Sequence, residues 1–176
     1  MAVGVHRTTF SDVARVAGIS RMTLYRRFPD LPSVLAALIA RDLGAIVAGT
    51  LAEVEHLATA RERLAEALVR GAEAMTRDPL VLRILEVDPE LLLPYVIDRI
   101  GETQRAVLDV LERYIAEGQR DGSIRGGDAP VMAACLELSA RGFVFSARAS
   151  ERACDAVSAF DQLRMMIDAY LTPVRP

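Results

Sequence analysis

The chain has 176 residues, of which 52% are hydrophobic and 26% charged, which is enough apolar residue for a core and excludes a disordered, collagen-like or disulfide-rich scaffold. All 21 basic residues are arginines; residues 1–50 carry six of them against three aspartates, whereas residues 51–176 are acidic and bring the formal net charge to -3. A small basic region on an acidic chain favours a nucleic-acid partner for the N-terminal part alone.

Residues 10–28 have the pattern of two short helices joined by a tight turn. Gly18 lies where the chain must reverse, because glycine adopts left-handed backbone angles without a steric cost. Ser20 is placed to cap the second helix through its hydroxyl group. Apolar residues on both helices are spaced to share one small core: Val13, Ala14, Ala17, Ile19, Leu24 and Phe28.

The second of these helices leaves a basic, hydroxyl-rich surface. We expect Arg21 and Thr23 to contact base edges, because arginine pairs bidentately with guanine and a threonine methyl group can meet that of thymine. Thr9, Tyr25 and Arg26 are candidates for phosphate contacts, which add affinity but no sequence information. The alternative is an ordinary helical hairpin with a solvated basic face. The exposed residues expected on this helix are Arg21, Met22, Thr23, Tyr25, Arg26 and Arg27.

This segment resembles the DNA-binding region of the tetracycline-repressor-like (TetR) regulators. The resemblance spans residues 8–29 and is carried by Thr8-Thr9-Phe10, Asp12-Val13-Ala14, Ala17-Gly18-Ile19-Ser20, Thr23-Leu24-Tyr25 and Phe28-Pro29. It implies an all-helical homodimer that binds a palindromic operator in double-stranded DNA and is released by a small-molecule effector. By position, the DNA surface would include Thr9, Arg21, Met22, Thr23, Tyr25 and Arg26.

The resemblance also implies a division into a DNA-binding domain, residues 1–50, and a ligand-binding and dimerisation domain, residues 51–176. Two features depart from the family pattern. Only nine residues precede Phe10, too few for the family's first helix, so the start is assigned late, the numbering begins inside a longer chain, or the helix is lacking. Leu31 stands where the family usually has a phosphate-binding lysine. The alternative function is therefore a dimeric small-molecule-binding protein of this fold that has lost DNA binding.

Helical periodicity continues to the C-terminus, and no strand pattern occurs. The interval 89–118 contains Pro94 and Gly101, which favour a kink or an early break. Asp128, at the end of a glycine-rich loop, is placed to cap the following helix. The expected helices are 32–57, a second one through 64–75, 80–87, 89–118, 129–149 and 152–171.

Two sets of residues in the C-terminal domain are candidate contacts. Apolar residues with a few polar groups predict a pocket for a largely apolar effector: Met75, Leu82, Leu92, Tyr95, Val96, Arg99 and Phe143. Wide apolar faces on the last two helices predict a two-fold four-helix interface: Met132, Cys135, Phe160, Leu163, Ile167 and Tyr170. For both sets the alternative is ordinary core.

Enzyme, metal and cofactor sites are not expected. Glu53 and His56 have the Glu-x-x-His spacing of di-iron bundles, but those need two such motifs and more glutamates. Two cysteines and two histidines, dispersed along the chain, do not form a zinc site, and no glycine-rich phosphate loop occurs.

The sequence also predicts a cytoplasmic protein. Charge-free stretches such as Leu31 to Ala40 and Leu43 to Ala52 are ten residues long, against about 20 for a membrane span. The N-terminus lacks the pattern of an export signal. Cys135 and Cys154 are expected to be small buried residues in a reducing compartment rather than a disulfide.

Overall fold

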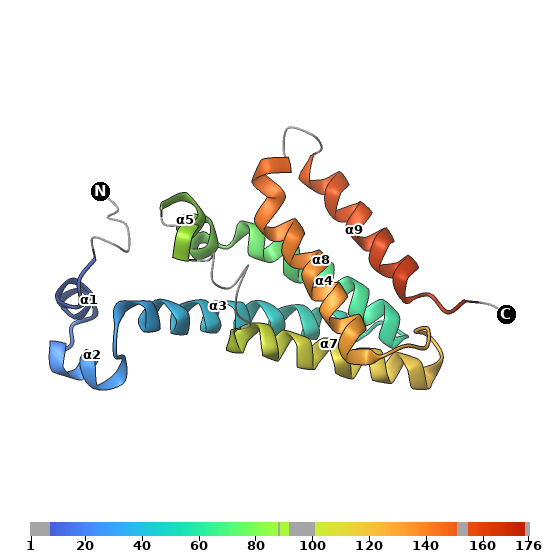
Figure 1. Cartoon of the computed structure of the whole chain (residues 1–176), viewed down its shortest axis with the longest axis horizontal. Coiled ribbons are helices and arrows are strands. Elements are labelled where there is room, and N and C mark those ends of the chain that lie inside the picture. Colours follow the sequence, from blue (N-terminus) through green and yellow to red (C-terminus); the bar gives the residue numbers. More distant parts are fainter. Residues whose placement is uncertain (1–7, 88, 92–100, 151–154, 175–176) are drawn as a thin grey trace.

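A computed structural model describes residues 8–87, 89–91, 101–150 and 155–174, and within these ranges every regular element is a helix (Figure 1). The fold class is therefore all-α, as predicted. The elements are α1 (Phe10–Ala17), α2 (Arg21–Arg27), α3 (Leu31–Val54), α4 (Ala60–Arg77), α5 (Pro79–Val87), the short 3₁₀ helix η2 (Pro89–Leu91), α7 (Glu102–Asp121), α8 (Ala129–Ser150) and α9 (Ala156–Leu171).

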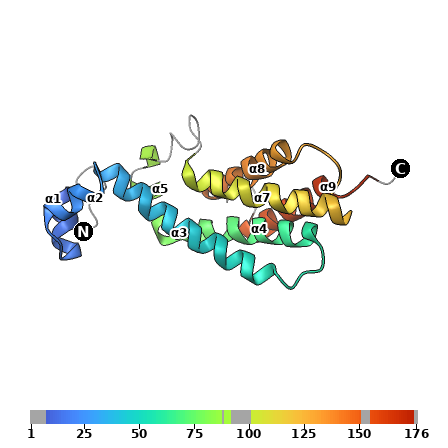
Figure 2. The ribbon, with the colours of Figure 1, turned by 90° about the horizontal axis from the view of Figure 1, so that it is seen from below.

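The molecule is elongated, with a small head at one end of a long helix. Figure 1 shows α1 and α2 at the N-terminal end of α3, and α4, α7, α8 and α9 bundled at the side of its C-terminal part. The perpendicular view in Figure 2 shows the same separation between the head and the remaining helices, which we call the body. Because α3 belongs to both parts, it is the structural link between them.

The body is built around α4, which packs against α3, α7, α8 and α9. Its repeated apolar positions fill one continuous core, in which Leu64, Val69 and Ile115 are almost completely buried. The last helix seals this core with Leu163, Ile167 and Leu171, which are also inaccessible. Burial of this apolar area is the main force that holds the helices together.

The loop between α7 and α8 is fixed by close packing. The Ile124 N–H donates to the Gly118 carbonyl over 2.8 Å, and the Ile124 side chain fills the space where a Cβ on residue 118 would lie. Arg125 then joins the loop to α9, because its Nε donates to the Tyr170 carbonyl over 2.6 Å and its guanidinium lies 4.3 Å from the Tyr170 ring. The predicted loop is therefore an ordered connection.

Most predicted helices are present, and their ends shift by a few residues: α9, for example, starts at Ala156 after the extended N-cap Asp155 and not at 152. One boundary is wrong by more than ten residues. The predicted helix 89–118 does not start at Pro89, which begins only the 3₁₀ turn η2; α7 starts at Glu102, after Gly101. The early break that Gly101 favours is thus the correct alternative, while Pro94 lies outside the described residues. Asp128 caps α8 as predicted, accepting from the Val131 N–H over 3.0 Å.

Two helices exceed the charge-free stretches counted in the sequence. By length and composition alone, α3 and residues Ala129–Ala147 of α8 are long and apolar enough to cross a membrane, with mean hydropathy 1.8 and 1.2. Counting charge-free residues missed them because a span tolerates an isolated charged pair such as Arg41 and Asp42. In this fold their apolar side chains serve another purpose, since both helices line the internal cavity described below.

Candidate DNA-binding surface and effector cavity

The head has a minimal core. Phe10, Ala14 and Leu24 are its three buried residues, and partly buried residues of α1, the α2–α3 connection and the start of α3 pack around them. Two predicted members are wrong, since Ala17 and Ile19 are exposed. Phe10 was not predicted as core, although its place as the first apolar residue of α1 signals it. The partly buried members are Val13, Phe28, Leu31 and Val34.

Side-chain caps define the head helices. The Thr9 hydroxyl oxygen accepts from the Asp12 N–H over 3.2 Å, while the Asp12 carboxylate accepts from the Thr9 N–H over 3.1 Å. These bonds from Thr9 lower the pKa of the Asp12 carboxyl. Gly18 ends α1 at φ 67°, and Ser20 caps α2 by accepting from the Thr23 N–H over 3.1 Å, as predicted.

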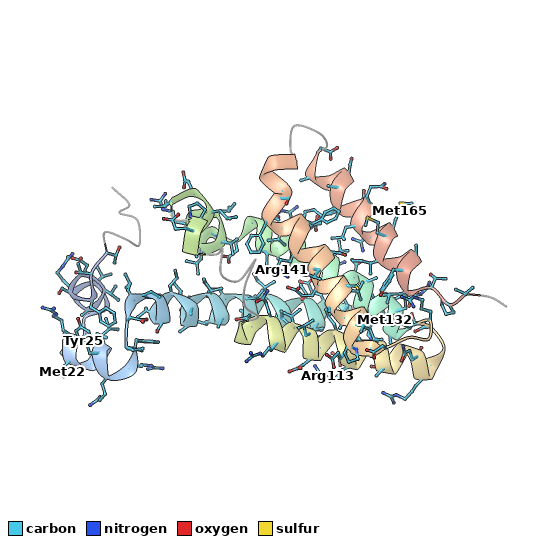
Figure 3. All side chains as sticks on the ribbon, viewed as in Figure 1. Met22, Tyr25, Arg113, Met132, Arg141 and Met165 are labelled. Atoms are coloured by element: carbon cyan, nitrogen blue, oxygen red, sulfur yellow. The ribbon has the colours of Figure 1, made fainter. Side chains whose placement is uncertain are left out.

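The exposed face of α2 points away from the body. Met22 is 77% exposed, and Figure 3 shows it with Tyr25 at the far end of the head. The Tyr25 ring stacks on Phe10 with ring centroids 4.5 Å apart, so the tyrosine is held by the core while half its surface stays accessible. All six candidate DNA-binding residues are exposed, with Thr9 at the start of α1 and the others on α2: Thr9, Arg21, Met22, Thr23, Tyr25 and Arg26.

The charge of this face is uncompensated. Helix α2 contains no acidic residue, and among the described residues Arg21 and Arg26 have no ion-pair partner. The nearby Asp12 is occupied by Thr9 and by Arg15 at 3.5 Å. By contrast, the body arginines that form ion pairs include Arg61, Arg63, Arg70, Arg77, Arg83, Arg141 and Arg164.

The body contains a partly open cavity of about 620 Å³ between α3, α4, α5, α7 and α8, a size typical of small-molecule sites. Met75 lines it as predicted. Leu82 and Phe143 do not: Leu82 is exposed, and Phe143 packs against Phe160 with ring centroids 6.2 Å apart. Phe145 lines the cavity instead. The remaining predicted pocket residues lie outside the described residues: Leu92, Tyr95, Val96 and Arg99.

Sequence reasoning missed two parts of this cavity. One is the inner face of α3 from Ser33 to Leu51, where small and branched apolar residues leave room for a ligand. The other is Glu137 and Arg141 on α8, an i,i+4 ion pair with a nitrogen–oxygen distance of 3.0 Å. An i,i+4 charged pair in the middle of a mostly apolar helix, whose other charged residue is Arg148 near its end, is a signal that could have indicated it.

The predicted interface residues require a correction. Met132, Phe160, Leu163 and Ile167 are at most 5% exposed within one chain, so they are core and have no surface left for a partner. Cys135 is exposed, so the expectation that it is buried is wrong, and Cys154 lies outside the described residues; Tyr170 is partly exposed. The opposite faces of α8 and α9 carry the exposed apolar side chains, with Met165 on the outer side of α9 (Figure 3): Val131, Leu138, Val157, Met165 and Met166.

Metal ligation has no geometric basis in the described part of the chain, where no three His, Cys, Asp or Glu side chains gather. His56 is exposed and lines a pocket together with Glu53 and Arg70, which form an ion pair over 2.9 Å.

Comparisons with known proteins agree with this arrangement. Residues 1–38 match the family described as bacterial regulatory proteins, tetR family. An uncharacterized HTH-type transcriptional regulator of Mycobacterium bovis is 32% identical over 168 residues, which are 96% of this chain and 86% of that protein. Among solved structures, the regulator FadR from Bacillus subtilis in complex with stearoyl-CoA has a TM-score of 0.71 at 20% identity and covers 96% of this chain and 91% of its own. AibR in complex with isovaleryl coenzyme A and operator DNA has a TM-score of 0.60 at 18% identity, covering 92% and 88%.

Proposed function

The chain belongs to the tetR family of bacterial regulatory proteins, and from that premise we propose that it is a ligand-responsive repressor that binds a palindromic operator as a homodimer. It is a helix-turn-helix regulator of transcription with a helical ligand-binding body.

The observation that carries the DNA-binding assignment is the outer face of α2. Arg21 and Arg26 are exposed cations without an ion-pair partner among the described residues, at the end of the molecule furthest from the acidic body. In a helix-turn-helix, the N-terminal residues of the second helix reach base edges in the major groove, while flanking cations bind phosphates. Arg21, Met22 and Thr23 lie at the N-terminal end of α2 and are placed to reach base edges. Tyr25 and Arg26 follow them and are placed to bind phosphates.

A gel-shift titration with the DNA upstream of the chain's own coding region tests this assignment at two salt concentrations. We expect steep salt dependence, because each neutralised phosphate releases counterions. The variant Arg21→Ala/Arg26→Ala is expected to lose specific binding. The matched control Arg113→Ala removes an exposed arginine from α7 and should bind normally. Unchanged binding by the double variant would favour the alternative, a small-molecule-binding protein of this fold without DNA binding.

The homodimer is supported by the outer faces of α8 and α9. Val131, Cys135 and Leu138 follow each other at i, i+4 and i+7 on α8, and Val157 and Met165 are more than half exposed on α9. Exposed apolar side chains that line up on helix faces are typical of an interaction surface, and a two-fold axis through such a surface gives the symmetry that a palindrome requires.

The mass in solution tests the dimer. The chain of 19.2 kDa should behave as a particle of twice that mass in light scattering. Leu138→Glu places a charge in the proposed interface and should give a monomer. Leu82→Glu, on α5 and also exposed, is the control that should stay dimeric. A monomeric wild-type protein would contradict the proposal.

We further propose that the effector is a largely apolar molecule bound in the 620 Å³ cavity. Two of the compared structures hold acyl-CoA molecules in the same fold, which supports an acyl compound. Helix α3 lines the cavity with Ser33 to Leu51, and at its N-terminus Leu31 and Val34 pack against the head core. A ligand that shifts α3 therefore moves α2, which changes the distance between the two recognition helices and lowers operator affinity.

A further inference from the structure

The cavity wall formed by α3, α4 and α5 offers a ligand no spare polar group. Its only side-chain hydroxyl groups are those of Ser33 and Thr50. The Thr50 hydroxyl donates within its own helix to the Ile46 and Val47 carbonyls, 3.0 Å to each, and Ser33 donates to Asp30. This wall therefore presents only hydrocarbon, and an alkyl chain is the chemistry that matches it.

The charged side chains lie on the opposite wall. Among the described residues, those that line the cavity are Arg105 on α7 and Glu137 and Arg141 on α8, which together carry a net charge of +1. Glu137 and Arg141 are largely buried, with side chains 12% and 19% exposed, and Figure 3 shows Arg141 within the body. Burial of a charged pair in an apolar cavity costs desolvation free energy, which favours a role for the pair in ligand recognition. A guanidinium has five N–H donors, so Arg141 can contact Glu137 through Nε and also donate to a ligand oxygen.

The dimensions of the cavity indicate an elongated ligand. The lining residues of α3 run from Ser33 to Leu51, about 27 Å at 1.5 Å per residue. At about 30 Å³ for each water-sized group, 620 Å³ holds about 20 non-hydrogen atoms. This is the size of a fatty acyl chain with its carbonyl end and well below that of a complete acyl-CoA.

We propose that the effector site holds a single unbranched acyl chain of about this size, with its carbonyl-end oxygen bound by Arg141 and its tail lying against α3 and α4. Glu137 is a positioning residue that holds the Arg141 guanidinium at the wall and reduces the positive charge beside the ligand. This inference rests on the proposed effector cavity and adds the orientation, the head-group chemistry and the length limit of the ligand.

Gly71 on α4 sets the length limit. A Cβ built there would have only the Thr50 Oγ1 within 4 Å, at 3.9 Å, so residue 71 faces open cavity. A leucine side chain has four carbon atoms, and at this position it would fill part of the cavity. Each buried methylene contributes about fourfold to affinity, so loss of this space favours shorter chains.

Calorimetric titration with palmitate, palmitoyl-CoA and hexadecan-1-ol, below their micelle concentrations, tests the head-group site. In Arg141→Gln, we expect palmitate affinity to fall about ten- to a hundredfold, because a charge-assisted hydrogen bond is lost. Hexadecan-1-ol should change less than about threefold, since it lacks the acyl oxygen. Arg113→Gln is the matched control outside the cavity, and Arg141→Lys should restore part of the affinity.

Glu137→Gln should change palmitate affinity in the opposite direction to Arg141→Gln. A merely structural role of the ion pair would instead lower the affinity in both variants. Removing its negative charge raises the wall from +1 to +2, so palmitate should bind severalfold more tightly while hexadecan-1-ol is unaffected. A smaller Arg141→Gln effect on palmitoyl-CoA than on palmitate identifies the free acid as the source of the head group; the reverse order identifies the thioester.

The tail assignment is tested with fatty acids of increasing length. Gly71→Leu should shift the tightest-binding chain about three to four carbons shorter. The control is Gly49→Leu, at an exposed helical glycine of α3 that does not line the cavity. It gains the same helix propensity and should keep the chain-length preference of the wild type.

Three outcomes would overturn the inference: unchanged palmitate binding in Arg141→Gln, equal losses for palmitate and hexadecan-1-ol, or an unchanged length preference in Gly71→Leu. Gel shifts without ligand distinguish this failure from failure of the proposed function. A protein that binds its operator but none of the acyl probes keeps its role as a regulator and loses this site. A protein that binds acyl chains with these preferences but binds no DNA keeps this site and loses the proposed role as a regulator.

Discussion

The head and the body are stabilised by different means. Three buried residues form the core of the head, whereas sixteen form that of the body. In the head, the capping box of Thr9 and Asp12 and the Ser20 cap satisfy the backbone groups at the helix starts. In the body, four helices surround α4 and bury its apolar face. The head is therefore defined mainly by local hydrogen bonds, and the body by tertiary packing.

This difference bears on how each part works. The head leaves apolar residues exposed, with Val16 at 80% and Ile19 at 42%, so it buries little area for its size. Low burial means low local stability, which allows the head to adjust to DNA while the body remains folded. The body, by contrast, must keep a defined cavity, which requires close packing around it.

A Leu→Ala substitution in the core of the body and in that of the head should give the largest difference in the free energy of unfolding. Leu163→Ala, at a fully buried site on α9, is expected to lower the free energy of unfolding of the body by about 2–5 kcal/mol, because it removes buried methyl groups and leaves a cavity. Chemical denaturation followed by circular dichroism measures this change.

Leu24→Ala is the counterpart in the head. It should abolish operator binding in a gel shift, because one of only three buried residues there is truncated, while the main unfolding transition stays within about 0.5 kcal/mol of wild type. If Leu24→Ala shifted the main transition as strongly as Leu163→Ala, the head and body would form one cooperative unit and the contrast would fail.

Gly18→Ala should have an intermediate, local effect. Gly18 has φ 67°, where an alanine costs about 1 kcal/mol, and no atom within 4 Å would contact the added Cβ. We expect operator affinity to fall about fivefold and hydrogen exchange of the α1 amides to accelerate, with exchange of the α4 amides unchanged. Equal acceleration in both helices would show that the two regions are coupled.

Acidification should give the smallest effect, again in the head. The pKa of Asp12 is lowered by hydrogen bonds from Thr9, so its cap contributes stability above the ordinary carboxyl pKa of about 3.9 and loses it as the pH falls through the lowered value. Below about pH 4, the α1 amides should therefore exchange faster relative to α4. Asp12→Asn removes the titrating group and should abolish that pH dependence; a dependence that persists in this variant would assign it to another group.

Local sequence signals located the head well, because its features act between near neighbours. Gly18 and Ser20 have the predicted conformations, and the six candidate DNA-binding residues are all exposed. The same reasoning misplaced Ala17 and Ile19 in the core. Their periodicity marks an apolar face, but it does not state whether another element covers that face.

The sequence by itself determined the helical fold class, most helix boundaries and the position of the helix-turn-helix, since caps, turns and periodicity depend on residues close along the chain. Only the tertiary structure decided which apolar face of each body helix is inside. Periodicity identified Phe160 and Phe143 as apolar, but burial within one chain assigns them to the core and leaves Val131 and Leu138 on the outside. The cavity arises in the same way, because Gly71, Glu137 and Arg141 come together only where α3, α4, α7 and α8 meet.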